Sequence, residues 1–315
     1  MTELRTLGSS DLAVSRLCLG GNVFGWTADR NDSFAVLDAY TAAGGNFIDT
    51  ADSYMNRPGN EPGQSERIIG EWLAARGGRD DVVIATKVAH HPDFRGLAPA
   101  NVKAAAEASL RRLGTDRIDL YYTHFDDESV PVADIITALD ELVREGKVRA
   151  IAASNISPQR LADSLAFSER EGLARYVALQ PHYNLVSRDT YEGELRDVVE
   201  RAGLGCVPYF ALASGFLTGK YRPGSTVDSE RSEPRLAGRY AGSERSARVL
   251  AALDEVAAER DAAHATVALA WLARQPTVVA PIASARNTEQ LPALLAMHDL
   301  ELTSDDLRKL DAASA

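Results

Sequence analysis

Residues 46–54, Asn-Phe-Ile-Asp-Thr-Ala-Asp-Ser-Tyr, carry the pattern on which the fold prediction rests. The apolar pair Phe47 and Ile48 runs into Asp49, and Tyr54 follows after a bend of small residues. Because successive side chains of a strand point to opposite faces, Phe47 and Asp49 share one face. The stretch therefore places an acid at the far end of a buried strand and a phenol in the loop behind it. α/β barrels present their active groups in this way, at the carboxyl ends of the strands.

Short apolar runs alternate with segments of helical periodicity along the rest of the chain. Runs that are apolar on both faces are typical of parallel strands covered by helices. In the segments between them apolar residues recur at spacings of three and four, as in Ile135, Leu139 and Leu142, which indicates amphipathic helices. Eight strand–helix units result, so we predict an α/β fold, a (β/α)8 TIM barrel with residues 1–315 in a single domain. The predicted strands are residues 16–19, the run around Phe47, and residues 82–85, 118–122, 148–152, 177–179, 204–207 and 278–282.

Four segments lie outside this eightfold pattern. Leu4–Ser15 predicts an N-terminal β-hairpin with its turn at residues 8–11, and residues 305–312 predict an extra C-terminal helix. Residues 55–65 and about 210–243 form long loops after the second and seventh strands. Long loops in a compact domain are usually functional or disordered. Since both follow strands, we expect them on the face of the barrel that carries the active groups.

Composition and charge limit the partners. The net charge of −11 and the pI near 5.1 argue against nucleic acid or anionic membranes, and leave a small molecule as the expected partner. Cys18 and Cys206 lie inside apolar runs, which favours buried thiols in a reducing compartment over a disulfide. With no signal-peptide pattern and no run of membrane-spanning length, we expect a cytoplasmic protein. Monomer and homo-oligomer both stay open.

Four polar residues stand at or just beyond strand ends: Asp49, Tyr54, Lys87 and His124. Any one of them alone is more often structural, but the ordered set suggests carbonyl reduction. A tyrosine with its ordinary pKa of about 10 is a poor acid at neutral pH. A neighbouring ammonium lowers that pKa by favouring the phenolate, and a carboxylate can hold the ammonium in place. We therefore predict that Lys87 acts on Tyr54 and that Asp49 pairs with Lys87.

The chain resembles the aldo-keto reductase family along nearly its whole length. The similarity implies that Asp49, Tyr54, Lys87 and His124 are the catalytic residues of a reductase that converts an aldehyde or ketone to an alcohol. It also implies NAD(P)H bound without a Rossmann domain, and the glycine cluster GGNVFG indeed lacks the G-x-G-x-x-G spacing of that domain. The residues that carry the resemblance are FIDTADSY, VVIATKV, SLRRLGTDRIDLYYTHFDD, GKVRAIAASNIS, LQPHYNLVSR, ASGFLTGKY and PIASARNTEQL.

The resemblance implies how the cofactor is held. Ser154, Asn155 and Gln180 bind the carboxamide, and Tyr209 stacks on the nicotinamide ring, roles that suit amide groups and a flat ring. The segment 210–220 lies across the pyrophosphate, and the loop that covers the cofactor extends to about residue 243. The implied cofactor contacts are Gly21, Asn22, Asp49, Ser154, Asn155, Gln180, Tyr209, Phe210, Ala211, Leu212, Gly215, Leu217, Lys220, Ser284, Arg286 and Gln290.

Residues after the eighth strand bear on cofactor choice. Ser284 and Arg286 suit an adenosine 2′-phosphate, because a planar guanidinium grips phosphate with two parallel bonds. Gln290 would reach the adenosine. This favours NADPH, with NADH as the alternative. Where relatives commonly place a Glu and an Asn for the adenine, however, this chain has Ala293 and Leu294.

The substrate region departs from the family pattern. Trp26 and Phe125 are predicted to line an apolar substrate site together with Tyr54 and His124. Phe125 begins a Phe-Asp-Asp sequence in place of the commoner Arg- or Trp-Pro-Asp. Met55 stands where a glycine often follows the tyrosine, and Phe210-Ala211 where Ser-Pro is usual.

Two other functions remain as alternatives. The chain could be a non-catalytic regulatory subunit that binds NADPH, or a barrel enzyme that uses Lys87 in a Schiff base or depends on a metal. His90 and His91 lack the spacing of a metal site, so no metal is predicted. Glu66 is interpreted as a first-turn helix acid, and the arginines of SLRRLG as a solvated helix end.

Overall fold

The computed structural model describes residues 3–55, 61–221, 240 and 242–315. Parts of the two predicted long loops, residues 56–60, 222–239 and 241, lie outside the described residues. None of the helices in the described ranges has the length and apolar character needed to cross a membrane.

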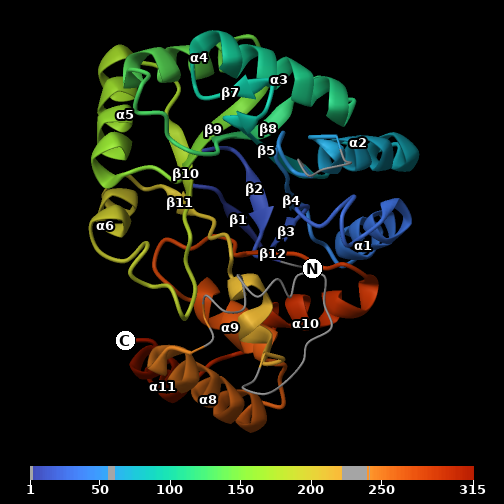
Figure 1. The fold of residues 1–315 in the computed structure, drawn as a ribbon, viewed down its shortest axis with the longest axis vertical. Coiled ribbons are helices and arrows are strands. Elements are labelled where there is room, and N and C mark those ends of the chain that lie inside the picture. Colours follow the sequence, from blue (N-terminus) through green and yellow to red (C-terminus); the bar gives the residue numbers. More distant parts are fainter. Residues whose placement is uncertain (1–2, 56–60, 222–239, 241) are drawn as a thin grey trace.

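Within the described residues, eight parallel strands form one sheet that curls into a barrel (Figure 1). Neighbouring strands pair in the order β11-β10-β9-β8-β5-β4-β3-β12. Backbone hydrogen bonds from Cys206 N to Thr277 O and from Val279 N to Cys206 O, both 2.8 Å, close the ring beside β12. The predicted (β/α)8 barrel is confirmed. The strands are β3 (Cys18–Gly20), β4 (Phe47–Asp49), β5 (Val83–Val88), β8 (Ile118–Thr123), β9 (Val148–Ser154), β10 (Tyr176–Gln180), β11 (Gly205–Cys206) and β12 (Ile282–Ala283).

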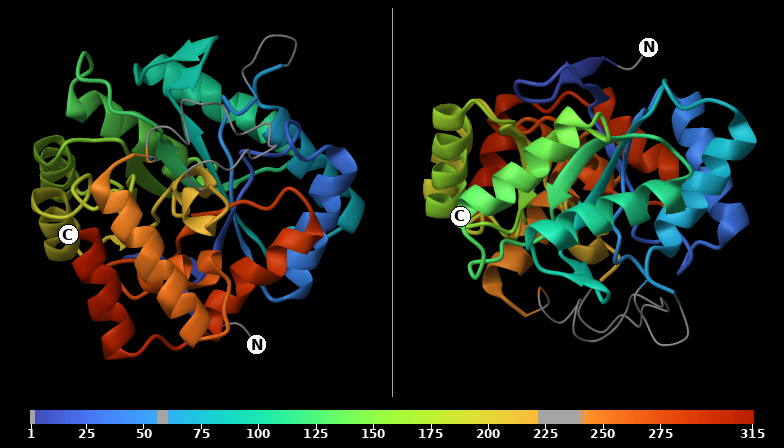
Figure 2. Two further views of the ribbon diagram at one scale, coloured as in Figure 1. Left: turned by 60° about the horizontal axis from the view of Figure 1, so that its bottom comes forward. Right: turned by 90° about the horizontal axis from the view of Figure 1, so that it is seen from above.

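Helices surround the strands as an outer layer, seen end-on in the left view of Figure 2. The helix over 158–171 begins and ends where the sequence indicates, because the Ser157 side chain accepts a bond from Arg160 N and Gly172 adopts a left-handed conformation. The helices are α1 (Arg30–Ala42), α2 (Gln64–Arg76), α3 (Pro99–Leu113), α4 (Val132–Arg144), α5 (Pro158–Glu171), α6 (Glu194–Arg201), α8 (Glu244–Glu259), α9 (His264–Ala273), α10 (Leu291–Leu295) and α11 (Ser304–Ser314), with 3-10 turns η1 (Ala213–Thr218), η2 (Thr288–Gln290) and η3 (Ala296–His298).

The core has two layers that follow strand parity. Phe47 packs with Leu120 and Tyr122 in the barrel interior, whereas Ile48 packs with the helices outside it. The expectation that Phe47 and Asp49 share the inward face is thereby confirmed for Phe47, and Asp49 is also buried. Because side chains alternate along a strand, Asp49 at the end of β4 lies on the same face as Phe47, towards the centre of the barrel.

The N-terminal hairpin closes one end of the barrel (Figure 2, right). Strands β1 (Leu4–Thr6) and β2 (Ala13–Ser15) pair antiparallel, as predicted, and Leu7 and Leu12 enter the interior layer. Gly8 at the turn has φ +55°, and a Cβ there would lie 2.0 Å from Val177 O, so the turn requires glycine. The predicted C-terminal helix is α11, which packs against α8.

One element escaped the sequence prediction. Strands β6 (His90–His91) and β7 (Phe94–Arg95) form a small antiparallel hairpin directly after β5. Strands of two residues are too short to show a hydrophobic periodicity in the sequence. The hairpin places His90 against Phe125, with ring centroids 4.0 Å apart.

Candidate active site

Three neighbouring strands bring the four predicted catalytic residues together. Asp49 ends β4, Tyr54 lies in the loop that follows it, Lys87 is on β5 and His124 comes directly after β8. Lys87 Nζ donates hydrogen bonds to Asp49 Oδ2 at 2.6 Å, to the Thr50 carbonyl at 2.6 Å and to Tyr54 Oη at 3.1 Å. The Tyr54 and His124 rings meet edge to face, with centroids 6.1 Å apart.

Burial sets the charge state of these groups. It raises the pKa of Tyr54 to about 12, although Lys87 acts in the opposite direction and Asp49 adds to the rise. Burial alone would lower the pKa of Lys87, but Asp49 and Tyr54 raise it above its ordinary value. Burial also lowers the pKa of His124 well below its usual range, and the nearby charge of Lys87 adds to this. At neutral pH the site therefore contains a phenol, an ammonium and a neutral imidazole.

This charge state corrects one part of the sequence interpretation. The lysine does lower the tyrosine pKa, as expected, but desolvation of the phenol is the larger effect. Lys87 therefore offsets the penalty of burying a future phenolate without bringing the pKa of Tyr54 below its ordinary value. A sequence shows the neighbour that a group will have, but not how completely water is excluded around it.

A second network joins the predicted catalytic residues to the predicted carboxamide site. Gln180 Nε2 donates to Asp49 Oδ1 at 2.9 Å, and Ser154 Oγ donates to the Gln180 carbonyl at 2.8 Å. Asn155 Nδ2 donates to the His124 carbonyl at 2.8 Å, and Tyr209 Oη donates to Asn155 Oδ1 at 2.8 Å. Asn155 has φ +47°, a left-handed conformation that asparagine tolerates. The amides are thus oriented by the residues beside them.

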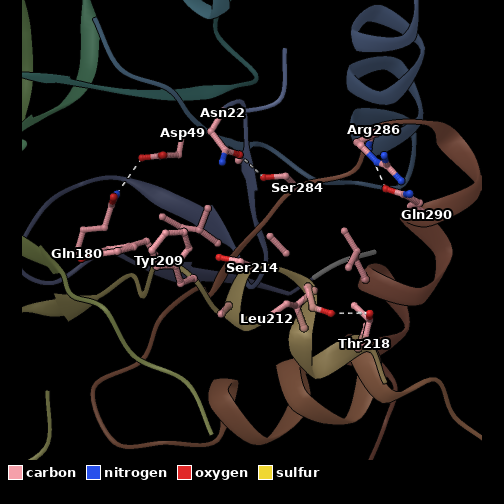
Figure 3. Close-up of a pocket in the computed structure, with 18 of the residues that line it drawn as sticks. Asn22, Asp49, Gln180, Tyr209, Leu212, Ser214, Thr218, Ser284, Arg286 and Gln290 are labelled. Carbon is pink, nitrogen blue, oxygen red and sulfur yellow. Dashed lines mark hydrogen bonds between the residues drawn. The ribbon is translucent and has the colours of Figure 1, made fainter. Parts of the chain in front are cut away.

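A cavity of about 780 Å³ extends from this network to the beginning of α10. Figure 3 shows Asp49 and Gln180 at one end of it and Arg286 and Gln290 at the other. Lys87 lies behind the wall, while Gly21 and Leu217 are not among the lining residues, since Gly21 binds the Asp49 carbonyl and Leu217 is buried in the core. The other predicted residues line the cavity: Asn22, Trp26, Asp49, Tyr54, His124, Phe125, Ser154, Asn155, Gln180, Tyr209, Phe210, Ala211, Leu212, Gly215, Lys220, Ser284, Arg286 and Gln290.

The residues present fit a nicotinamide dinucleotide. Asn155 and Gln180 supply amides at the end of the cavity beside Asp49, and Lys220 and Arg286 supply cations, which suit phosphate groups. Ser214 Oγ, in the wall between them, is buried and has no hydrogen-bond partner among the described residues. Ala213, Ser214 and Gly215 all have positive φ, the kind of strained backbone that gathers at ligand sites.

Several lining residues were missed by the sequence analysis. They come from β3, from η1 and the segment after it, from the beginning of α9 and from β12. Most of them are small or apolar residues that carry no chemical signal, and the polar ones form no motif. Ala293 and Leu294 do line the cavity, so the two departures noted above lie in its wall. Met55 has φ +73°, the conformation a glycine would adopt there. The missed residues are Gly20, Ser214, Thr218, Tyr221, Ala263, His264, Ala265, Ile282 and Ala283.

The fold and the site together define an oxidoreductase of the α/β-barrel class. The chain belongs to the aldo/keto reductase family, whose family model matches residues 16–315. It is an NAD(P)H-dependent oxidoreductase that reduces aldehydes or ketones.

Curated relatives agree with this assignment. The chain is 35% identical to the uncharacterized oxidoreductase YrpG of Bacillus subtilis, over 98% of this chain and 95% of the relative. It is 32% identical to norsolorinic acid reductase stcV of Emericella nidulans, over 95% of this chain and 78% of the relative. A probable voltage-gated potassium channel subunit beta of Oryza sativa is 32% identical, over 92% and 89% of the two chains. The similarity to the channel subunit supports the regulatory alternative no better than the similarity to the reductases supports a catalytic function.

Proposed function

We propose that the chain is an NADPH-preferring reductase in which Tyr54 donates the proton to the carbonyl oxygen of the substrate. The observation that carries this proposal is the buried series of contacts from Asp49 to Lys87 and from Lys87 to Tyr54, at 2.6 and 3.1 Å, beside a cavity. A phenol that is protonated at neutral pH and touches an ammonium can release its proton as negative charge develops beside it.

Each catalytic side chain has one role. Lys87 stabilises the phenolate that Tyr54 becomes, and Asp49 keeps Lys87 charged and in place. His124 is neutral, so its ring can donate a hydrogen bond that orients the carbonyl oxygen. Trp26 and Phe125 line the cavity and offer apolar surface to the substrate.

NADPH would be held along the cavity. Asn155 and Gln180 would bind the carboxamide and Tyr209 would cover the ring, while Lys220 and Arg286 would meet the phosphates. The reduced nicotinamide supplies the hydride when it is bound. The guanidinium of Arg286 favours NADPH over NADH. The two buried thiols, Cys18 and Cys206, support a reducing compartment such as the cytoplasm.

The Schiff-base alternative finds little support in the site. A lysine attacks a carbonyl as the free amine, whereas Asp49 and Tyr54 hold Lys87 as an ammonium. Among the described residues no group of three or more His, Cys, Asp or Glu side chains is placed to hold a metal ion.

The test of the proposed function is the Tyr54→Phe variant. We expect kcat with an aldehyde to fall by about 10²–10⁴-fold, because the proton donor is removed. NADPH affinity, measured by fluorescence titration, should stay within about threefold, since Tyr54 is assigned to the proton and not to cofactor binding. Tyr121→Phe is the matched control, because Tyr121 is another buried tyrosine but packs in the outer layer and does not line the cavity.

Two outcomes would contradict the proposal. Wild-type turnover in Tyr54→Phe would remove Tyr54 from the chemistry. If the wild-type chain bound NADPH but reduced none of a panel of aldehydes and ketones, the regulatory alternative would replace catalysis.

A further inference from the structure

We propose that Arg112, a residue of α3 outside the cavity, is a positioning residue that holds Tyr54 against Lys87 through a buried ion pair with Glu66. The inference rests on the proposed role of Tyr54. The 3.1 Å contact between Lys87 Nζ and Tyr54 Oη joins a strand to a loop, so it depends on how β5 and the segment after β4 are placed relative to each other.

The ion pair contacts the strand that carries Lys87. Arg112 Nε donates to Glu66 Oε2 at 2.6 Å, and the two side chains are 8% and 0% exposed. The other oxygen, Glu66 Oε1, accepts a hydrogen bond of 2.6 Å from Thr86 Oγ1. Thr86 directly precedes Lys87 on β5 and points to the opposite side of the sheet. Glu66 therefore binds the outer face of β5 at the residue next to the catalytic lysine.

The same arginine contacts the segment that carries Tyr54. Gly63 N donates to the Tyr54 carbonyl at 3.0 Å. Gly63 has φ +79°, and a Cβ on it would lie 2.5 Å from Arg112 Nε and 2.6 Å from Arg112 Cδ. The Arg112 side chain thus packs directly against the backbone that binds Tyr54. Through one guanidinium, both partners of the Lys87–Tyr54 contact are connected.

A second buried acid, Asp52, is influenced by the charges of this ion pair. Asp52, two residues before Tyr54, is fully buried, and neither of its carboxyl oxygens has a hydrogen-bond partner among the described residues. The charge of Glu66 raises the pKa of Asp52, and the charge of Arg112 lowers it. Without Arg112, the buried side chain of Glu66 would lose its ion-pair partner.

Such an ion pair determines the positions of the groups around it more than it determines the stability of the fold. A buried ion pair adds little net stability compared with apolar side chains of similar volume, but its geometry is specific. Removing one partner leaves the other charge buried and unpaired. A displacement of about 1 Å at a reacting group can lower a rate by about 10²-fold. We therefore expect loss of Arg112 to act on kcat more than on cofactor binding.

The experiment compares Arg112→Met, Arg112→Lys and Glu66→Gln with Arg111→Met. Arg111 is the exposed neighbour on the same helix, so it controls for loss of a positive charge. We expect Arg112→Met to lower kcat by about tenfold or more while NADPH affinity changes by less than about threefold, with Arg112→Lys partly restoring kcat. Glu66→Gln removes the same ion pair and should also lower kcat. This variant tests the inference if Arg112→Met does not fold.

A double mutant separates positioning from a general structural effect. If Arg112 acts through Tyr54, Arg112→Met should lower kcat no further in a Tyr54→Phe background. Additive losses, or a kcat that falls only in proportion to the folded fraction, would overturn the inference. If both Arg112→Met and Glu66→Gln kept the wild-type kcat, the inference would be overturned as well. The proposed function would still stand in that case, provided that Tyr54→Phe is inactive. An active Tyr54→Phe would instead refute the proposed function first.

Discussion

Single residues in this barrel act mainly through burial. Asp49, Lys87 and Glu66 are charged side chains with almost no exposed surface, and each has a partner at 2.6 Å. Asp52 is equally buried but lacks a hydrogen-bond partner among the described residues. Burial, followed by the neighbouring charge of Glu66, raises its pKa from 3.8 to about 8, against the opposing effect of Arg112.

This shift predicts a pH-dependent stability that Asp52→Asn should remove. Between the two pKa values the folded state holds a proton that the unfolded state has lost, so the free energy of unfolding falls as pH rises from about 4 towards 8. The asparagine variant has no such proton, and at pH 8 it should be more stable than the wild type by about 1–4 kcal/mol. Urea unfolding at pH 5 to 8 measures this, with exposed Asp163→Asn as control. Parallel curves for wild type and Asp52→Asn would show that the carboxyl is ionised in the folded state.

Among the elements, the N-terminal hairpin stabilises the barrel at a distance from the candidate site. Leu7 and Leu12 are 0% and 1% exposed, and they pack in the interior layer with Phe47 and Val177. The hairpin fills the end of the barrel that lies away from the predicted catalytic residues. It therefore contributes to stability, while the loops after the strands contribute chemistry.

We predict that Leu7→Ala lowers the free energy of unfolding by about 2–5 kcal/mol, because it leaves a cavity in a packed interior. Leu4, in the same hairpin, is 48% exposed, and Leu4→Ala should change stability by less than about 0.5 kcal/mol. Neither substitution should alter KM for NADPH or kcat at a temperature where the protein is folded. Denaturant unfolding and steady-state kinetics provide both readouts. A change in kcat with Leu7→Ala would mean that the interior layer transmits strain to the site.

The cavity beside Asp49 and Tyr54 is built by elements from the whole chain. Its lining runs from Gly20 to Leu294 and draws on β3, β4, β9, β10, β12, η1, α9 and α10, together with the segments after β8 and before α10. A ligand that binds such a cavity binds only the folded chain. Its binding free energy is therefore added to the stability of the barrel.

We predict that NADP⁺ raises the melting temperature and that NAD⁺ raises it less. At a ligand concentration about 100 times Kd the added stability is about 2.7 kcal/mol, which corresponds to a shift of several degrees in a chain of this size. Arg286→Met should remove most of the difference between the two cofactors, whereas Arg308→Met, at an exposed position of α11, should leave it unchanged. Differential scanning fluorimetry gives the comparison. Equal shifts for both cofactors in the wild type would contradict the preference for NADPH.

Much of the fold and site was predictable because the information is local. Alternating apolar and amphipathic segments predict strands and helices, and their order predicts a barrel, since parallel neighbours need a helical connection. Once β4, β5 and β8 are neighbours, Asp49, Lys87 and His124 must meet at one end of the sheet. Short elements were placed less well: the predicted strand 278–282 is observed as Ile282–Ala283.

The amino-acid sequence by itself determined the barrel, the resemblance to a family and the four groups at its mouth, because these depend on periodicity and on residue type. Only the tertiary structure decided how those groups are charged and what holds them. Arg112 was interpreted as part of a solvated helix end, yet it is buried against Glu66, a residue 46 positions earlier in the chain. Tyr54 was expected to be made more acidic by Lys87, yet exclusion of water raises its pKa. The free energy of a charge depends on everything packed around it, and those neighbours come from parts of the chain that no local pattern connects.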